Sequence, residues 1–203
     1  MTERMSAQVG YVGDLRRTIM IDSVFDVYLD IETTGLSAFY DDITVVGMYQ
    51  VNGGDGKLIQ LVGNEVTADN LLEALENVHT IYTYNGSRFD LPFIRAFLGL
   101  DLTDGYYHHD LMYDCWKNNL HGGLKGVERQ LGISRELKGI GGLEAVMLWW
   151  RYKNYGNQDA LSVLLHYNGE DVVNLKALRE RLCNRLNDAS KSTGVTNESE
   201  SGS

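Results

Sequence analysis

The stretch that decides the fold runs from residue 24 to residue 36 and reads Val-Phe-Asp-Val-Tyr-Leu-Asp-Ile-Glu-Thr-Thr-Gly-Leu. Its first eight residues are mostly apolar, which is typical of a strand buried near the centre of a sheet. The strand ends in two carboxylates, Asp30 and Glu32, and side chains two residues apart project from the same face. Two carboxylates about 4 Å apart repel by roughly 4 kcal/mol at an effective dielectric of about 20. The pair therefore favours a divalent cation between its oxygens.

Two further carboxylates occur in distinctive surroundings. Residues 84–94 read Tyr-Asn-Gly-Ser-Arg-Phe-Asp-Leu-Pro-Phe-Ile, which places Asp90 just after a second apolar strand. Residues 167–171 read Tyr-Asn-Gly-Glu-Asp, which places Asp171 four residues after Tyr167. Acids in the first turn of a helix also favour the helix dipole, so each of them has a purely structural alternative role.

The order of these motifs resembles the DEDD superfamily of 3′-5′ exonucleases, which have a ribonuclease H-like fold. The similarity is greatest to the branch whose third motif is Tyr-x-x-x-Asp. That branch includes the proofreading domains of family B polymerases and small stand-alone bacterial and archaeal relatives. The resemblance spans residues 24–187, and its most specific part is Asn85 with Phe89-Asp90-x-Pro92.

The resemblance implies a nuclease with two divalent ions. All-oxygen ligands suit Mg²⁺ or Mn²⁺. By analogy with the family, Asp30 would bridge both ions, while Glu32 and Asp171 would bind the ion that activates water. Asp90 would act mainly through water on the other ion. The expected reaction is hydrolysis of phosphodiester bonds at the 3′ end of single-stranded DNA or RNA.

The water-orienting residue has two candidates, because the third motif satisfies the pattern of two branches. Four residues on a regular helix return to within about 40° of the starting direction, whereas five leave a side chain about 140° away. This geometry places Tyr167 on the face of Asp171 and favours it over His166. Gly169 weakens the helix here, so His166 stays an alternative.

The family pattern also indicates substrate contacts. Backbone NH groups from Thr33 onward would lie near the terminal nucleotide, with Leu36 against its base. Asn85 could bond sugar or backbone, and Phe89 could stack on a base, although core packing is the favoured role for Phe89. Asp110 matches a frequent acidic position in the stand-alone relatives, but the set of four ligands is complete without it.

Charge is distributed unevenly along the chain of 203 residues, whose net charge is −10. That sign argues against a general nucleic-acid coating protein, since affinity for a polyanion normally comes from many Lys and Arg contacts. Residues 117–153 hold seven bases and three acids, a local balance of +4. We expect Arg129, Arg135 and Lys138 to contact phosphates, and a solvated face explains the same charge run equally well.

Length and hydropathy predict one domain over residues 20–187, preceded by an arm at 1–19 and followed by a disordered tail at 188–203. No apolar run reaches the 18 or more residues of a membrane span, so we expect a cytoplasmic protein without membrane contact.

The periodicity predicts an α/β domain with five strands, of which the first three form an antiparallel meander. The order of elements resembles that of a ribonuclease H-like domain, which implies a mixed five-stranded sheet, with parallel strands after the meander, flanked by helices. The expected strands are 24–31, 43–51, 57–62, 79–84 and 106–111, and the expected helices are 67–78, 90–98, 124–131, 142–152, 158–167 and 170–186.

Two other functions fit the same fold. One is an endonuclease that cuts RNA strands or branched DNA with the same metal core. The other is a catalytically idle module that binds nucleic acid or a partner. The presence of all four acids and Tyr167 disfavours the idle module, whereas the pattern does not separate exonuclease from endonuclease, or DNA from RNA.

Overall fold

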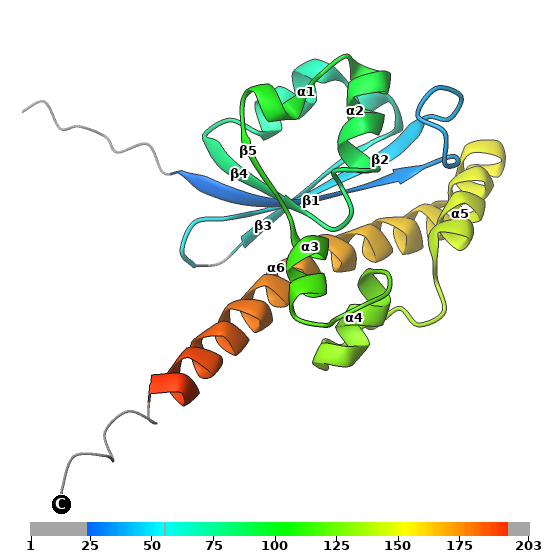
Figure 1. The fold of residues 1–203 in the computed structure, drawn as a ribbon. Coiled ribbons are helices and arrows are strands. Elements are labelled where there is room, and N and C mark those ends of the chain that lie inside the picture. Colours follow the sequence, from blue (N-terminus) through cyan, green and yellow to red (C-terminus); the bar gives the residue numbers. More distant parts are fainter. Residues whose placement is uncertain (1–23, 55, 195–203) are drawn as a thin grey trace, which may run out of the picture.

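The computed structural model describes residues 24–54 and 56–194, and Figure 1 shows their course. The expected arm at 1–19 and the end of the expected tail, 195–203, lie outside the described residues. The strands are β1 (Phe25–Thr33), β2 (Ile43–Val51), β3 (Gly56–Val62), β4 (Val78–Thr83) and β5 (Tyr107–Asp110). The α-helices are α1 (Ala68–Ala74), α2 (Asp90–Leu98), α3 (Leu111–Lys117), α4 (Leu124–Leu131), α5 (Gly142–Tyr155) and α6 (Gln158–Gly194), with short 3-10 turns at Gly63–Glu65 and Leu102–Asp104.

The five strands form one mixed sheet in the order β3-β2-β1-β4-β5. The first three strands pair antiparallel, while β4 pairs parallel with β1 and β5 pairs parallel with β4. The expected mixed sheet, with its meander followed by parallel strands, is therefore confirmed. Strand β1 lies at the centre of the sheet, between β2 and β4.

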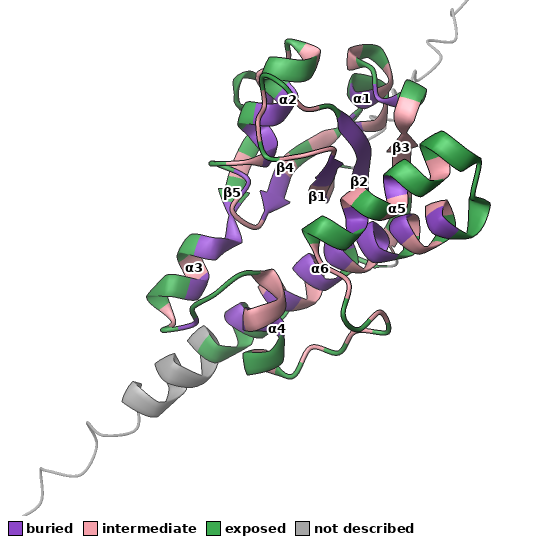
Figure 2. Cartoon of the chain, turned by 90° about the vertical axis from the view of Figure 1, so that its right-hand side faces the viewer, coloured by how far each residue is buried: buried purple, intermediate pink, exposed green. Residues whose placement is uncertain are grey.

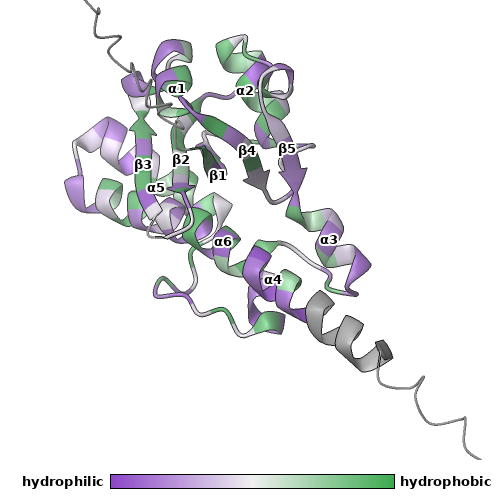
Figure 3. Cartoon of the chain, turned by 90° about the vertical axis from the view of Figure 1, so that its left-hand side faces the viewer, coloured by the Kyte–Doolittle hydropathy of each residue, from purple (hydrophilic) through white to green (hydrophobic). Residues whose placement is uncertain are grey.

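Helices cover both faces of this sheet. Figure 1 shows α1 and α2 on one side and the long helix α6 on the other. One apolar cluster joins β1, β2 and β4 to α1 and α2, with Val27, Phe93 and Ile94 almost wholly enclosed. A second joins the opposite face to α3, α4 and α6. The buried residues in Figure 2 follow these two layers, and the flanking helices carry both hydrophobic and hydrophilic residues in Figure 3.

The last helix differs from the sequence-based expectation. Instead of two helices at 158–167 and 170–186, α6 runs without a break from Gln158 to Gly194. Glycine within a helix costs about 1 kcal/mol relative to alanine. Packing explains the choice of glycine, since a Cβ at Gly169 would lie 3.2 Å from Leu58 Cδ2 of the sheet. The helix therefore continues through Gly169 and lies close against β3.

Helix α3 was not expected from the sequence. It begins directly after β5, where the Asp110 side chain accepts a hydrogen bond from the backbone N–H of Met112 at 3.1 Å and caps the helix. A strand that passes into a helix without a turn leaves no glycine or proline signal between them. In the part of the chain that is described, no helix is long and apolar enough to cross a lipid bilayer.

Candidate active site

Three carboxylates meet at the end of β1. One oxygen each from Asp30, Glu32 and Asp171 lie within 4.8 Å of one another. Asp30 and Glu32 come from the same face of β1, and Asp171 comes from α6, which crosses that face. The pairing of β1 with β2 shifts register between Glu32 and Thr33. Such a bulge re-aims side chains next to a site.

Asp90 lies beside this cluster and was expected to be part of it. Its Oδ1 accepts the backbone N–H of Ile31 at 3.1 Å. The parallel pairing of β1 with β4 ends at Tyr28, so Asp90 supplies an acceptor beyond the last paired residue. Asp90 is thus held against the backbone between the two β1 acids, while the tight group within 4.8 Å consists of the other three.

Burial and mutual repulsion raise the pKa values of the acids in this cluster. Burial and the repulsion from Asp171 and Asp90 raise the pKa of Asp30 well above its usual value. Burial and Asp171 do the same for Glu32, and burial raises the pKa of Asp90 to about 7. The Oε1 atom of Glu32 is enclosed and has no hydrogen-bond partner among the described residues. An enclosed, unpaired carboxylate oxygen among other acids fits the ligand set of a hard divalent cation.

A buried amide orients Asp30, and the sequence analysis missed it. Asn168 Nδ2 lies 3.4 Å from the Asp30 side-chain atom Oδ2, and Gln60 of β3 donates to Asn168 Oδ1 at 2.9 Å. The amide reaches the strand because Gly47 of β2 lies opposite Asp30, and a Cβ at Gly47 would overlap Asn168 Oδ1. Asn168 lies inside the Tyr-Asn-Gly-Glu-Asp motif, which was the available signal.

The two candidates for the water-orienting residue have different surroundings. Tyr167 is buried, and its hydroxyl accepts a hydrogen bond from Lys125 Nζ at 2.6 Å. Burial and the charge of Asp171 raise the pKa of Tyr167. His166 is half exposed, and its Nε2 lies 3.2 Å from Glu136 Oε2. Tyr167 therefore faces the acids, as the helical spacing predicts, and His166 lies beside Glu136.

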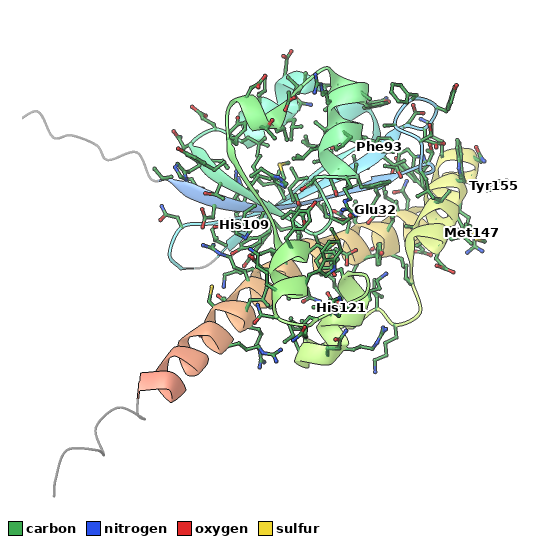
Figure 4. The ribbon with its side chains drawn as sticks, in the orientation of Figure 1. Glu32, Phe93, His109, His121, Met147 and Tyr155 are labelled. Atoms are coloured by element: carbon green, nitrogen blue, oxygen red, sulfur yellow. The ribbon has the colours of Figure 1, made fainter. Side chains whose placement is uncertain are left out.

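A cleft of about 1090 Å³ opens over the acids and is lined by Asp30, Asn85, Lys125, Arg129, Tyr167 and Asp171, among others. In Figure 4, Glu32 lies between the side of α2, marked by Phe93, and the side of α4, marked by His121. Lys125, which the sequence placed only in a basic segment, is half-buried here, and burial lowers its pKa. The cleft thus combines acids at its floor with cations on its α4 side.

The residues expected to contact substrate lie in different places. Leu36 is 87% exposed in the loop after β1, and the Thr33 hydroxyl donates to the carbonyl of Gly35 at 2.5 Å. Phe89 packs against the main core and against Phe93, at 5.4 Å between ring centroids. Core packing, the favoured expectation for Phe89, is what the structure has.

Asp110 and Asn85 form one local structure. The carboxylate of Asp110 accepts the backbone N–H of Asn85 at 2.8 Å and both the N–H and the hydroxyl of Ser87. Asn85 has a φ of 64°, a left-handed conformation that asparagine tolerates better than most residues. The Asp110 carboxylate therefore stabilises the turn that precedes Asp90, in addition to capping α3.

The basic residues separate into two groups. Arg129 and Lys138 are exposed, and Arg129 lines the cleft. Arg135 differs from its expected role on an exposed phosphate-binding face, because its side chain is only 9% exposed and pairs with Glu128 and Asp171. A charge pattern in sequence does not distinguish an arginine on the surface from one within an ion pair.

Taken together, the mixed sheet and the acids at the end of its central strand indicate an RNase H-like α/β fold of the nuclease type. The chain belongs to the RNase H superfamily, whose RNase_H_2 family matches residues 27–183. A DEDD exonuclease is consistent with this membership.

A curated relative matches most of the chain. The chain is 28% identical over 174 residues to the protein named Uncharacterized protein YprB of Bacillus subtilis (strain 168), covering 74% of this chain and 40% of that relative. The chain therefore spans less than half the length of that curated protein.

Solved structures share the fold. Brucella melitensis NrnC bound to pGG superposes with a TM-score of 0.57 at 23% identity, over 85% of this chain and 79% of that one. The family B DNA polymerase of Pyrobaculum calidifontis gives a TM-score of 0.55 at 14% identity, over 75% of this chain and 24% of the polymerase.

Proposed function

We propose that the protein is a metal-dependent 3′-5′ exonuclease that hydrolyses phosphodiester bonds of single-stranded DNA or RNA. The observation that carries this proposal is the group of three carboxylates within 4.8 Å of one another, two of which, Asp30 and Asp171, line an open cleft. Support also comes from the fold relative NrnC, which has been solved bound to pGG and, separately, with bound Mg²⁺.

The residues that would hold two Mg²⁺ or Mn²⁺ ions are Asp30, Glu32, Asp90 and Asp171. Bound cations would supply activation of water and neutralisation of the charge that develops on the phosphate and the leaving oxygen. Asp90 keeps the β1 backbone fixed through its bond to Ile31, so it orders the acids on either side of that residue.

Tyr167 would orient the attacking water through its hydroxyl. Lys125 donates to that hydroxyl, so the hydroxyl proton is free to point toward an acceptor in the cleft. Lys125 also brings positive charge next to the acids, where a phosphate would enter. Arg129 at the cleft wall and the exposed Lys138 would hold the strand by its phosphates, without reading bases. Thr33, Leu36 and Asn85 would contact the terminal nucleotide.

The test is cleavage of 5′-end-labelled single-stranded DNA and RNA with Mg²⁺ or Mn²⁺, with EDTA as the metal-free control. An exonuclease of this polarity gives a ladder that shortens one nucleotide at a time from the 3′ end, and it leaves a circular single strand intact. Cleavage of the circle would show an endonuclease. Absence of cleavage of both polymers with either metal would contradict the proposed activity.

A further inference from the structure

A buried ion pair between Glu128 and Arg135 contacts Asp171. Arg135 Nε donates to Glu128 Oε2 at 2.5 Å, and Arg135 Nη2 donates to Glu128 Oε1 at 2.8 Å. The same Nη2 also donates to Asp171 Oδ1. The side chain of Glu128 is only 1% exposed, although it carries a carboxylate. The proposed exonuclease chemistry assigns no role to Glu128.

The pair is fixed from a second direction by α6 itself. Asn174, one turn after Asp171, donates through Nδ2 to Glu128 Oε1 at 3.0 Å. Glu128 belongs to α4, and Arg135 belongs to the segment that follows α4. The planar guanidinium can engage both carboxylates at once because its donors form a rigid fork. Asp171 is thereby held in one orientation relative to α4.

Arg135 is badly placed for contact with substrate. It is absent from the residues that line the cleft, and its Nη1 is enclosed by protein atoms. Nor does the pair reduce the charge of the site, since the charges of Glu128 and Arg135 cancel. Replacing a buried ion pair with apolar residues is often neutral or stabilising, so stability alone is a weak reason for this one. Because the guanidinium contacts Oδ1, Asp171 keeps its other oxygen for a further ligand.

We propose that the Glu128–Arg135 pair is a positioning device for the metal site, which fixes the carboxylate of Asp171 in the orientation that binds a divalent cation. This inference rests on the proposed function. Partners that orient a metal-binding carboxylate contribute to metal affinity without touching the metal. Electrostatics alone predicts the opposite change in metal affinity, since removal of a cation from beside acids should strengthen the binding of a divalent ion.

The test measures Mn²⁺ binding by isothermal titration calorimetry, without substrate. The decisive variant is the double substitution Glu128→Gln with Arg135→Met, which removes the ion pair and leaves the net charge unchanged. Neither Glu128 nor Arg135 then remains as a buried charge without its partner, and Asp171 loses its guanidinium contact, which is the change under test. We expect it to fold with the parent's circular dichroism spectrum and to raise the Kd for Mn²⁺ by about 10-fold or more. The matched control is Arg181→Gln, which removes an exposed arginine from the same helix as Asp171 and should change the Kd by less than about twofold.

Two single variants separate geometry from charge. Arg135→Gln should weaken Mn²⁺ binding although it removes a positive charge, and Arg135→Lys should restore only part of the affinity because an ammonium lacks the fork. In cleavage assays, kcat should fall in the double variant at saturating metal while KM for the oligonucleotide changes little. The inference is overturned if the double variant binds Mn²⁺ as tightly as the parent, or more tightly. Failure of the parent itself to bind Mn²⁺ would overturn the proposed function together with this inference.

Discussion

The two ends of strand β1 carry the same kinds of residue and have different uses. At the end where the strand begins, Asp26 pairs with Arg179 of α6 at 2.8 Å. The guanidinium of Arg179 also lies 4.0 Å from the centroid of the Tyr82 ring and donates to the hydroxyl of Tyr28 at 3.1 Å. One acid faces one base, and both side chains are about one-third exposed, at 30% and 34%. The result is a link between helix and sheet.

At the other end, β1 and α6 again bring charged side chains together, but acids outnumber bases. The four acids of the site, together with Glu128, face Arg135 and Lys125. Burial makes this excess of negative charge unfavourable, and the pKa of Asp30 is raised for that reason. Charge balance, more than residue type, therefore distinguishes a structural ion pair from a site prepared for a cation.

The strongest test of this comparison is the same substitution at both ends of the strand. Asp30→Asn should lower cleavage by more than about 100-fold, because it removes a proposed ligand. It should also abolish most of the rise in melting temperature that Mg²⁺ or Mn²⁺ gives the parent. Asp26→Asn should keep activity and metal response and lose at most about 1 kcal/mol of stability, as is usual for a partly exposed pair.

Differential scanning fluorimetry with and without metal measures the melting temperatures of both variants. An unchanged metal response in Asp30→Asn would count against the acid cluster as the metal site. A lost response in Asp26→Asn would show that the two ends do not differ in the way proposed.

A second comparison uses two buried tyrosines. Tyr167→Phe should lower kcat by about 100-fold if its hydroxyl orients the attacking water. Tyr28→Phe removes a buried hydroxyl that accepts a bond from Arg179, so it should cost about 1 kcal/mol of stability and leave kcat unchanged. His166→Ala belongs in the same series. A larger loss of kcat in His166→Ala than in Tyr167→Phe would reverse the assignment of the water-orienting residue.

The smallest expected effect concerns two exposed cations, Arg129 at the cleft and Lys138 in the segment after α4. The double variant Arg129→Gln with Lys138→Gln should raise KM several-fold for a long oligonucleotide, and its log-log salt slope should fall by about 0.7 for each phosphate that the variant no longer neutralises. Metal-dependent stabilisation should persist. The control is Arg181→Gln with Arg185→Gln, which removes the same amount of charge from the C-terminal half of α6, away from the cleft. Equal KM values and salt slopes in both double variants would mean that the strand enters by another surface.

Local patterns were sufficient for most of the fold. The apolar strand ending at Asp30 and Glu32, the turn glycines before Gly56 and the leucine spacing of α1 each follow from contacts within a few residues of one another. Such patterns predict elements because backbone hydrogen bonds and the alternation of side chains are short-range properties. The order of elements then left one architecture, the mixed five-stranded sheet that the structure has.

Local patterns failed where distant contacts decide. Gly169 looked like the end of a helix, yet the approach of Leu58 from the sheet favours glycine within α6. The sequence pattern also gave no structural role to Asp110, which accepts hydrogen bonds from the turn at residues 85–87. Neither partner is near in sequence, so neither contact leaves a local signal.

The sequence by itself determined the central strand and the fold class, and it selected the acids and Tyr167 as candidates, since these depend on residue type and on short spacings within β1, α2 and α6. Only the tertiary structure decided which charges are balanced. Asp171 accepts a hydrogen bond from Arg135, which lies in the segment after α4. Asp30 accepts one from Asn168 of α6, which reaches the strand over Gly47. The reason is physical: the energy of a charge depends on its burial and on neighbours within a few ångströms, and folding, not chain order, sets both.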